Sequence, residues 1–222
     1  MNHTEKIKAE ILAVGCEMLD KGLVAGTWGN ISARIPDTEF IAVTPSGKSY
    51  REITASDVIV VDETGAVIEG SFKPSSELPL HLAIYHARPD ISAIVHTHSV
   101  FASACAVART GIPPIIEDLV QLVGGSVDVA AYALPGTDIL AQNTVAALAQ
   151  KNAVLMANHG VVGCGQSLAE AMTACELVEK AAQIYIYANQ IGGAQVLADE
   201  DIEVMHSFYL TYYRQRQQGR KI

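Results

Sequence analysis

Cysteine, positive charge and long apolar runs are all scarce in this 222-residue sequence, and each scarcity excludes a class of protein. The four cysteines include no Cys-x-x-Cys pair and lack the dense spacing of a secreted scaffold, so we expect reduced thiols in the core. No apolar run reaches the length of a membrane span, and the first residues lead into an amphipathic pattern rather than a signal peptide. We therefore expect no membrane association and a location in the cytoplasm.

Acidic residues outnumber basic ones, 24 against 15, which gives a formal net charge of -9. A protein with this charge repels phosphate backbones over most of its surface, so we expect no nucleic-acid partner. The basic residues near the C-terminus are typical of a solvated end, and we expect a flexible tail over residues 216–222. Hydrophobic residues make up 50% of the chain and charged residues only 18%, which favours an oligomer whose subunits cover part of one another's surface.

The pattern along the chain predicts one domain, residues 1–222, because no linker, repeat or low-complexity tract interrupts it. Apolar spacings of three and four predict helices, and short β-branched runs predict strands. The expected helices are 4–20, 78–88, 100–108, 115–123, 138–150, 168–189 and one beginning after 199; the expected strands are 40–43, 58–61, 67–68, 91–95, 127–132, 153–157 and 161–163. Residues 25–32 have the composition of a glycine-bearing turn. Hairpin-like neighbours mixed with helices predict an α/β fold with a mostly antiparallel central sheet flanked by helices.

The most informative motif is His96-Thr97-His98, which follows an apolar run. Residues i and i+2 of a strand project from the same face, so His96 and His98 can point at one ion. Asn158-His159-Gly160 ends a second apolar run, and a hairpin there would bring His159 to the same end of the sheet. A His-x-His pair alone is more often a surface or core pair. Three imidazoles with open coordination positions indicate a catalytic metal site rather than a closed structural one.

A carboxylate and several hydroxyl groups accompany the histidines. Glu77 stands directly before the predicted helix 78–88, where it can serve as a fourth metal ligand or as a base. By itself it would be an ordinary acid at a helix N-terminus. Backbone amides of glycine turns and short polar side chains near a helix start can bind a phosphate, although each alone is more often turn chemistry. The candidates of this kind are Asn30, Ser46, Gly47, Ser75 and Ser76. The other histidines, His3, His81, His86 and His206, are not counted as ligands.

Five motifs in this order resemble the class II aldolase and adducin head-domain family, over residues 5 to 215. They are Gly29-Asn30-Ile31-Ser32, Thr44-Pro45-Ser46-Gly47, Lys73-Pro74-Ser75-Ser76-Glu77, His96-Thr97-His98 and Asn158-His159-Gly160. The resemblance implies a single-domain α/β/α sandwich with a mostly antiparallel sheet. It also implies a homotetramer with active sites at the subunit interfaces.

The resemblance also assigns roles to the candidate residues. His96, His98 and His159 would bind a divalent metal, Zn²⁺ or alternatively Mn²⁺, Co²⁺ or Fe²⁺, and Glu77 would be the acid/base that also approaches the metal. The phosphate of a small phosphorylated sugar would be held by Asn30, Ser46, Gly47, Ser75 and Ser76.

One position departs from the family pattern. Aldolases of the family have a tyrosine after the His-x-His segment that donates a proton during carbon–carbon cleavage, and the aligned place here holds Glu117. Asp118 beside it is a loose match to an aspartate of the family's epimerases. Tyr212 is the best match to a C-terminal tyrosine that reaches the site of a neighbouring subunit. We therefore expect Glu117 or Tyr212 to handle the aldehyde oxygen.

These observations predict a metal-dependent aldolase that cleaves L-fuculose 1-phosphate, or a related deoxy-ketose 1-phosphate, to dihydroxyacetone phosphate and an aldehyde. One alternative is a pentulose-5-phosphate 4-epimerase. Another is a decarboxylase or dehydratase of a sugar-acid or ketose phosphate, since stabilisation of an enolate serves those reactions equally well. A non-catalytic adducin-like interaction domain is disfavoured because it would need no metal triad.

Overall fold

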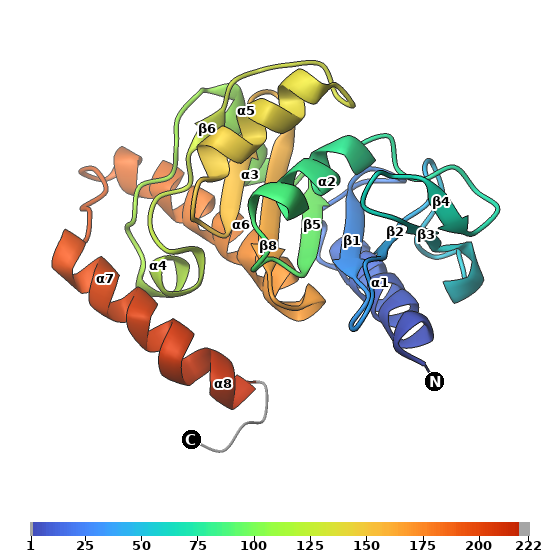
Figure 1. Cartoon of the computed structure of the whole chain (residues 1–222). Coiled ribbons are helices and arrows are strands. Elements are labelled where there is room, and N and C mark those ends of the chain that lie inside the picture. Colours follow the sequence, from blue (N-terminus) through green and yellow to red (C-terminus); the bar gives the residue numbers. More distant parts are fainter. Residues whose placement is uncertain (1, 218–222) are drawn as a thin grey trace.

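The computed structural model describes residues 2–217, and these contain an eight-stranded sheet in the order β4-β3-β2-β1-β5-β8-β7-β6 (Figure 1). Neighbouring strands are antiparallel, with the exception of the parallel pair β6 and β7. The strands are β1 (Asn30–Arg34), β2 (Ile41–Val43), β3 (Ile59–Val61), β4 (Val67–Glu69), β5 (Ala93–Thr97), β6 (Val129–Ala130), β7 (Ala153–Met156) and β8 (Gly160–Gly165). This confirms the expected mostly antiparallel sheet.

Helices cover both faces of the sheet. They are α1 (His3–Asp20), α2 (Leu78–Ala87), α3 (Val100–Val107), α4 (Glu117–Val123), α5 (Asp138–Leu148), α6 (Leu168–Gln190), α7 (Asp199–Phe208) and α8 (Arg214–Gln217), with a π-helical turn, Tyr209–Tyr213, between the last two. The apolar side chains of α1, α3, α4 and α6 share one core, and those of α2 and α5 share the other. The sheet is thus the middle layer of an α/β/α sandwich (Figure 1).

The alternation of side chains along each strand divides the two cores. On β5, Val95 belongs to the core under α6, whereas Ile94 belongs to the core under α2 and α5. Val161 and Val162 of β8 are divided in the same way. Because both faces are buried, the central strands are continuous apolar runs rather than alternating ones.

The turn predicted over residues 25–32 was wrong for the last three residues, which belong to a strand. Asn30–Arg34 is strand β1, which pairs with β2 on one side and β5 on the other. Ile31 and Ala33 enter the core under α1, while Asn30 and Ser32 find polar partners on the opposite face. The strand alternation is therefore present in the sequence, but its small and polar residues look like a loop.

Two smaller differences concern the segments around α4. The strand expected over 127–132 shortens to Val129–Ala130, since Val127 instead forms an isolated bridge with Ile112. The helix expected from residue 115 begins at Glu117, because Ile116 still has extended backbone. Of the tail expected over 216–222, residues 216 and 217 belong to α8, and the remainder lies outside the described residues.

The C-terminal helices form an arm that runs along α4 (Figure 1). On α7, His206 Nδ1 lies 2.8 Å from the carbonyl oxygen of Gln121. The buried carboxylate of Glu170 on α6 accepts hydrogen bonds from the Tyr209 hydroxyl at 2.9 Å and from Arg214 Nε at 2.8 Å. These charge-assisted bonds hold the arm to the body of the molecule.

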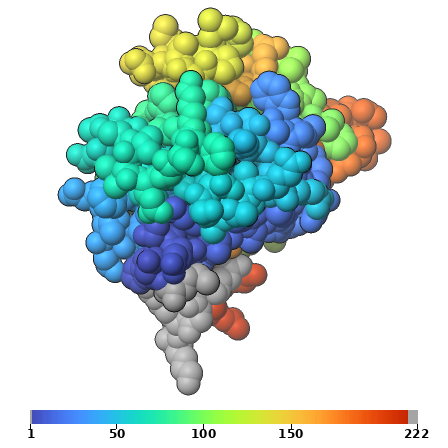
Figure 2. All heavy atoms as spheres, turned by 90° about the vertical axis from the view of Figure 1, so that its right-hand side faces the viewer, coloured from blue at the N-terminus to red at the C-terminus, as the bar shows by residue number. Residues whose placement is uncertain are grey.

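The sheet edge at β4 faces the viewer in Figure 2, where the first half of the chain forms most of the surface and α5 lies above it. The edge strand has only three residues, all exposed, and it ends at Glu69, which accepts a 2.7 Å bond from Lys8. A short strand with a charged end is a common protection against edge-to-edge pairing.

Within residues 2–217, no helix combines the length and the apolar character that crossing a membrane requires. The four cysteines, all inside this range, are free thiols. Burial raises the pKa of Cys175 to about 12, so this thiol stays protonated at neutral pH.

Candidate metal centre and substrate pocket

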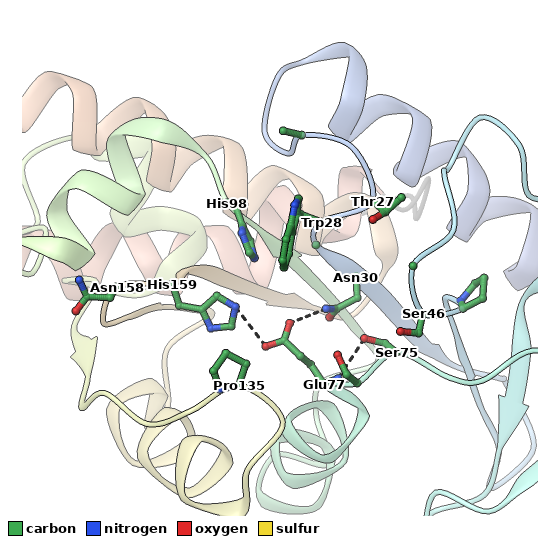
Figure 3. A pocket seen from close by; sticks show the side chains of 15 residues that line it. Thr27, Trp28, Asn30, Ser46, Ser75, Glu77, His98, Pro135, Asn158 and His159 are labelled. Carbon is green, nitrogen blue, oxygen red and sulfur yellow. Dashed lines mark hydrogen bonds and ion pairs between the residues drawn. The ribbon is translucent and has the colours of Figure 1, made fainter.

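Three imidazole rings converge where β5 ends and where β7 turns into β8. Two of them, His98 and His159, are drawn in Figure 3. His96 belongs to β5, and His98 follows the end of that strand. His159 lies in the turn of the hairpin formed by β7 and β8, which the sequence predicted. The ring centroids are 4.6 Å apart for His96 and His98, 4.8 Å for His96 and His159, and 5.0 Å for His98 and His159. One ligand atom from each ring lies within 4.8 Å of the others. The three histidines therefore lie close together, as the spacing of the two motifs predicted.

The surroundings of His96 and His98 keep these two rings neutral. Burial, reinforced by the neighbouring imidazoles, lowers the pKa of both His96 and His98 to about 3. His96 Nδ1 lies 2.9 Å from the carbonyl oxygen of Val161, which can only accept, so the ring proton is on Nδ1 and the lone pair on Nε2. That Nε2 faces His98 Nε2 at 2.8 Å. At least one lone pair is therefore held toward the centre of the triad by the fold.

A glycine permits this convergence. A Cβ atom on Gly160 would collide with the carbonyl oxygen of Thr97 and would lie 3.2 Å from His96 Cε1 and 3.3 Å from His98 Cδ2. Asn158, two residues earlier, has φ +55, in the left-handed region that asparagine tolerates better than most residues. The turn therefore needs both its asparagine and its glycine to place His159.

Glu77 completes the polar centre from the opposite layer. It is the N-cap residue of α2, and its carboxylate lies 3.3 Å from His96 Nε2 through Oε2 and 3.3 Å from His159 Nε2 through Oε1. Oε2 also accepts a 2.7 Å hydrogen bond from the Asn30 amide (Figure 3). Oε1 and His159 Nδ1 are buried without a hydrogen-bond partner, although buried polar atoms are normally satisfied.

This donor set fits a divalent cation. Three neutral imidazoles and one carboxylate oxygen are ligands that zinc and similar metals take in catalytic sites. A cation between the rings would satisfy the His96 Nε2 lone pair that the fold holds toward the centre of the triad, and also the Glu77 oxygen that no hydrogen bond reaches. The histidine triad can therefore bind a divalent metal.

A cavity of about 580 Å³ opens above this centre. Its inner end contains Glu77, His98 and His159, and its other end is formed by the turn after β2 and the segment before α2 (Figure 3). That second end presents Ser46, Gly47, Ser75 and Ser76. Gly47 has φ +67 and open space beside its Cα atom, so a ligand can approach its backbone closely.

Comparison with known proteins matches residues 9–186 to the family model described as Class II Aldolase and Adducin N-terminal domain. The chain belongs to this family. It is 37% identical over 211 residues to 5-deoxy-D-ribulose 1-phosphate aldolase of Bacillus thuringiensis serovar kurstaki, covering 95% of this chain and 99% of that protein. It is 35% identical over 208 residues to L-fuculose phosphate aldolase of Escherichia coli, covering 93% and 95%. A solved L-fuculose 1-phosphate aldolase superimposes with a TM-score of 0.89 at 38% identity, over 92% of this chain and 96% of the other.

Within this class II aldolase domain, the five phosphate-site candidates all line the cavity, but they are not equivalent. Ser46 and Ser76 are exposed, whereas Ser75 is buried and accepts a 3.2 Å bond from the Glu77 backbone N–H through its hydroxyl. The Asn30 amide is engaged with Glu77. The exposed pair and Gly47 are the groups most free to meet a ligand.

The structure does not bring Glu117 and Tyr212 into the cavity of their own chain. Glu117 is exposed at the start of α4, and Tyr212 is 51% exposed in the π-helical turn, stacked on Phe208 at 5.6 Å between ring centroids. Asp118, the loose match, forms an ion pair with Lys180. The roles assigned to Glu117 and Tyr212 remain predictions, and they require a second subunit to approach the cavity.

Two residues at the site were missed by the sequence prediction. Trp28, 65% exposed, lines the cavity with its ring 5.8 Å from the His98 imidazole. His81, which the sequence analysis only excluded as a metal ligand, is fully buried and hydrogen-bonded to Asn30. Its position four residues after Glu77 on a helix places both on one face, which is the signal that could have found it.

Proposed function

We propose that this protein is a metal-dependent aldolase that cleaves a ketose 1-phosphate to dihydroxyacetone phosphate and an aldehyde. The observation that supports it most directly is the Glu77 carboxylate, 3.3 Å from both His96 Nε2 and His159 Nε2, at the inner end of a cavity whose other end presents hydroxyls and a glycine turn. In this arrangement Glu77 would be a base beside the proposed cation, within reach of the proposed phosphate site.

The metal would be held by His96, His98 and His159, with Glu77 close by. We propose Zn²⁺, and Mn²⁺, Co²⁺ and Fe²⁺ suit the same donors. When bound, such a cation would supply Lewis-acid stabilisation of negative charge on the ketose oxygens, since neutral imidazoles leave its charge largely intact.

The protein groups divide the remaining work. Ser46, Gly47, Ser75 and Ser76 would hold the phosphate and so fix the distance from C1 of the ketose to the metal centre. The C4 hydroxyl would lose its proton to the Glu117 carboxylate of a neighbouring subunit, or through the Tyr212 hydroxyl of that subunit to solvent, and become the aldehyde as the C3–C4 bond breaks. The electron pair of that bond would go to C3, which receives a proton from Glu77 to give dihydroxyacetone phosphate. Glu77 would take up this proton from solvent before the step and end it as the carboxylate.

The relatives support a ketose 1-phosphate as substrate, because the curated aldolases above are named for 5-deoxy-D-ribulose 1-phosphate and for L-fuculose phosphate. Both substrates end in a methyl group beyond the cleaved bond. Trp28 and Pro135 give the cavity apolar walls that suit such an end. We therefore propose a deoxy-ketose 1-phosphate.

We further propose a homotetramer with its sites at subunit interfaces. Large apolar side chains of the C-terminal arm, Val204, Phe208, Leu210, Tyr212 and Tyr213, are exposed in the single chain, which is typical of a surface that another subunit covers. The unpaired thiols are consistent with a reducing compartment, and we propose the cytoplasm.

The test is to incubate the zinc-loaded protein with 5-deoxyribulose 1-phosphate, L-fuculose 1-phosphate and L-ribulose 5-phosphate and to follow triose-phosphate release. We expect release from at least one of the 1-phosphates and its loss in a chelator, with recovery when metal is returned. Isomerisation of L-ribulose 5-phosphate without triose release would indicate the epimerase instead. Inactivity toward all three substrates would refute the proposed reaction.

A further inference from the structure

Strand β1 and helix α2 are joined by a set of polar side chains that lie at regular spacings on both elements. Asn30, Ser32 and Arg34 alternate along β1, so they share one face of the strand. Glu77, His81 and Tyr85 are four residues apart, so they share one face of the helix. The two faces meet, and Asn30, Ser32, His81, Tyr85 and Glu77 are all buried.

The hydrogen bonds between these faces form one continuous chain. Asn30 Nδ2 donates to Glu77 Oε2 at 2.7 Å, and Asn30 Oδ1 lies 2.6 Å from His81 Nε2. His81 Nδ1 lies 2.6 Å from Ser32 Oγ, which lies 2.8 Å from the Tyr85 hydroxyl. Arg34 closes the far end, with Nη2 donating to the Tyr85 carbonyl oxygen at 2.8 Å and its guanidinium 4.7 Å from the centre of the Tyr85 ring.

The donors and acceptors in this chain of hydrogen bonds can be arranged in one direction only. An ionised Glu77 can only accept, so Asn30 turns its NH₂ group to Glu77 and its oxygen to His81. Because Asn30 Oδ1 can only accept a hydrogen bond, His81 Nε2 must carry a proton. Burial lowers the pKa of His81 to about 3, so the neutral ring has no second proton and its Nδ1 accepts from Ser32. The other end of the chain of hydrogen bonds leads to the same tautomer. The buried Tyr85 hydroxyl has Ser32 Oγ as its partner and donates to it, so the Ser32 hydroxyl donates to His81 Nδ1 and leaves the ring proton on Nε2.

Every donor in the chain therefore points toward Glu77. If Asn30 turned over, its oxygen would face the carboxylate and its NH₂ group would face a ring N–H, and two buried contacts would become repulsive. Each such loss costs on the order of 1–3 kcal/mol. The amide is thus locked by residues that do not touch the cavity, since neither His81, Ser32 nor Tyr85 lines it.

We propose that His81 is a positioning residue for Glu77: its Nε2–H tautomer, set by Ser32 and Tyr85, fixes the Asn30 amide so that Oε2 of Glu77 is always occupied and Oε1 is left free for the reaction. Oε1 is the oxygen that faces His159 and has no hydrogen-bond partner. The inference deepens the proposed function and rests on it for the role of Oε1. It also gives Asn30 a second role beside the phosphate binding expected for it, because its amide would orient the base.

The direct test is the tautomer of His81, read from the ¹⁵N NMR shifts and ring couplings of the full-length protein labelled at histidine, at neutral pH. The His81→Gln variant assigns the signal by its absence. We expect a protonated Nε2 and an unprotonated Nδ1. The opposite tautomer, or a doubly protonated ring, would overturn the proposal. This measurement does not depend on catalysis. An inactive protein would therefore refute the proposed function but would leave the His81 tautomer to be decided by the NMR measurement.

Kinetics of three variants test the consequence. His81→Leu removes the donor to Asn30, whereas His81→Gln can keep an N–H near the same place, and His86→Leu on the exposed side of the same helix is the matched control. For His81→Leu we expect kcat to fall about 10- to 100-fold with KM and bound metal nearly unchanged, as for other residues that orient a functional group. His81→Gln should restore most of kcat, and His86→Leu should behave as wild type.

Two kinetic outcomes would overturn the proposal. One is a His81→Leu variant that keeps full kcat, and the other is a rise in KM with kcat unchanged, which would place Asn30 in substrate binding instead. If His81→Leu fails to fold, Tyr85→Phe takes its place, because it removes one hydroxyl and keeps the ring. We expect its His81 signal to show exchange between tautomers, and an unaltered signal would count against the chain.

Discussion

The two oxygens of Glu77 have different surroundings, and this difference determines what the residue can do. Oε2 is held by Asn30 at 2.7 Å, while Oε1 is buried with only an imidazole, His159, 3.3 Å away. The first contact fixes the carboxylate in place, and the second leaves an oxygen that can take or give a proton. These surroundings are the reason we propose that Glu77, a residue at a helix N-terminus, acts as a base.

Replacing the carboxylate by an amide tests this role. Glu77→Gln keeps the size of the side chain but removes the base, so we expect kcat for the ketose 1-phosphate to fall by about 10²- to 10⁴-fold, the range typical of general acid–base catalysis. Bound metal, measured on the same sample, should remain because the three imidazoles are intact. Glu63→Gln, at an exposed acid, is the control. A Glu77→Gln enzyme with near-normal kcat would contradict the assignment.

The buried histidines also predict how stability depends on pH. The pKa of His81 is about 3 in the folded protein against an ordinary value of 6.5, so the unfolded chain takes up a proton below 6.5 and the folded chain does not until about 3. The stability is therefore complete above pH 6.5 and declines as the pH falls toward 3. Each such group contributes up to about 1.4 kcal/mol per pH unit in that window. We expect the free energy of unfolding in urea, measured on metal-free protein, to fall less steeply between pH 6.5 and 4 for His81→Gln than for wild type. Equal slopes of this free energy against pH would argue against the lowered pKa of His81.

Among the elements, the hairpin of β7 and β8 determines where the third imidazole lies. Gly160 starts β8 directly against Thr97 of β5, and no side chain fits between them. The histidine cluster therefore depends on backbone packing as much as on the imidazoles themselves.

Gly160→Ala should separate the strands and displace His159. We expect zinc affinity to fall about 10- to 100-fold, as it does when the support of a metal ligand is lost, along with roughly 1–3 kcal/mol of stability. Gly165→Ala is the matched control, because its Cβ would press on Glu170 and Ala171 at the other end of the same strand. It should lose stability but keep its zinc affinity, which isothermal titration calorimetry would measure. Equal zinc affinity in both variants would contradict this role for the turn.

The sequence allows prediction of the histidine cluster because the positions of its residues follow from local rules. The His96 and His98 spacing matches one face of a strand, and the turn at His159 follows from an apolar run on either side. Strand β1 was missed because its residues are small and polar, and its partners are distant in the sequence. His81 was missed for the same reason, since its importance depends on Asn30 and Ser32 of that strand. Cross-element hydrogen bonds carry no periodic signal of their own.

In the whole molecule, the arm that follows α6 is the reason we propose that one chain alone does not form the complete active site. Glu170 holds Tyr209 and Arg214, and the π-helical turn between them presents Tyr212 to solvent. The exposed tyrosine and the cavity belong to the same chain but do not meet within it.

Subunit mixing tests whether they meet between chains. Glu77→Gln and Tyr212→Phe should each be nearly inactive alone, yet co-assembled oligomers should recover roughly a quarter of wild-type activity, since a site needs one intact contribution from each of two subunits. Mixing after assembly, without exchange, should restore nothing. A fully active Tyr212→Phe enzyme would remove the tyrosine from the mechanism, and Glu117→Gln would then be examined in the same way.

The central claim is that His96, His98 and His159 bind one divalent cation per chain. The most direct measurement is the metal content of the purified protein, by elemental analysis after dialysis against zinc and then against buffer. We expect close to one equivalent for wild type and for His86→Ala, and almost none for His98→Ala with its fold intact by circular dichroism. Wild-type protein without metal, or His98→Ala with as much metal as wild type, would contradict it.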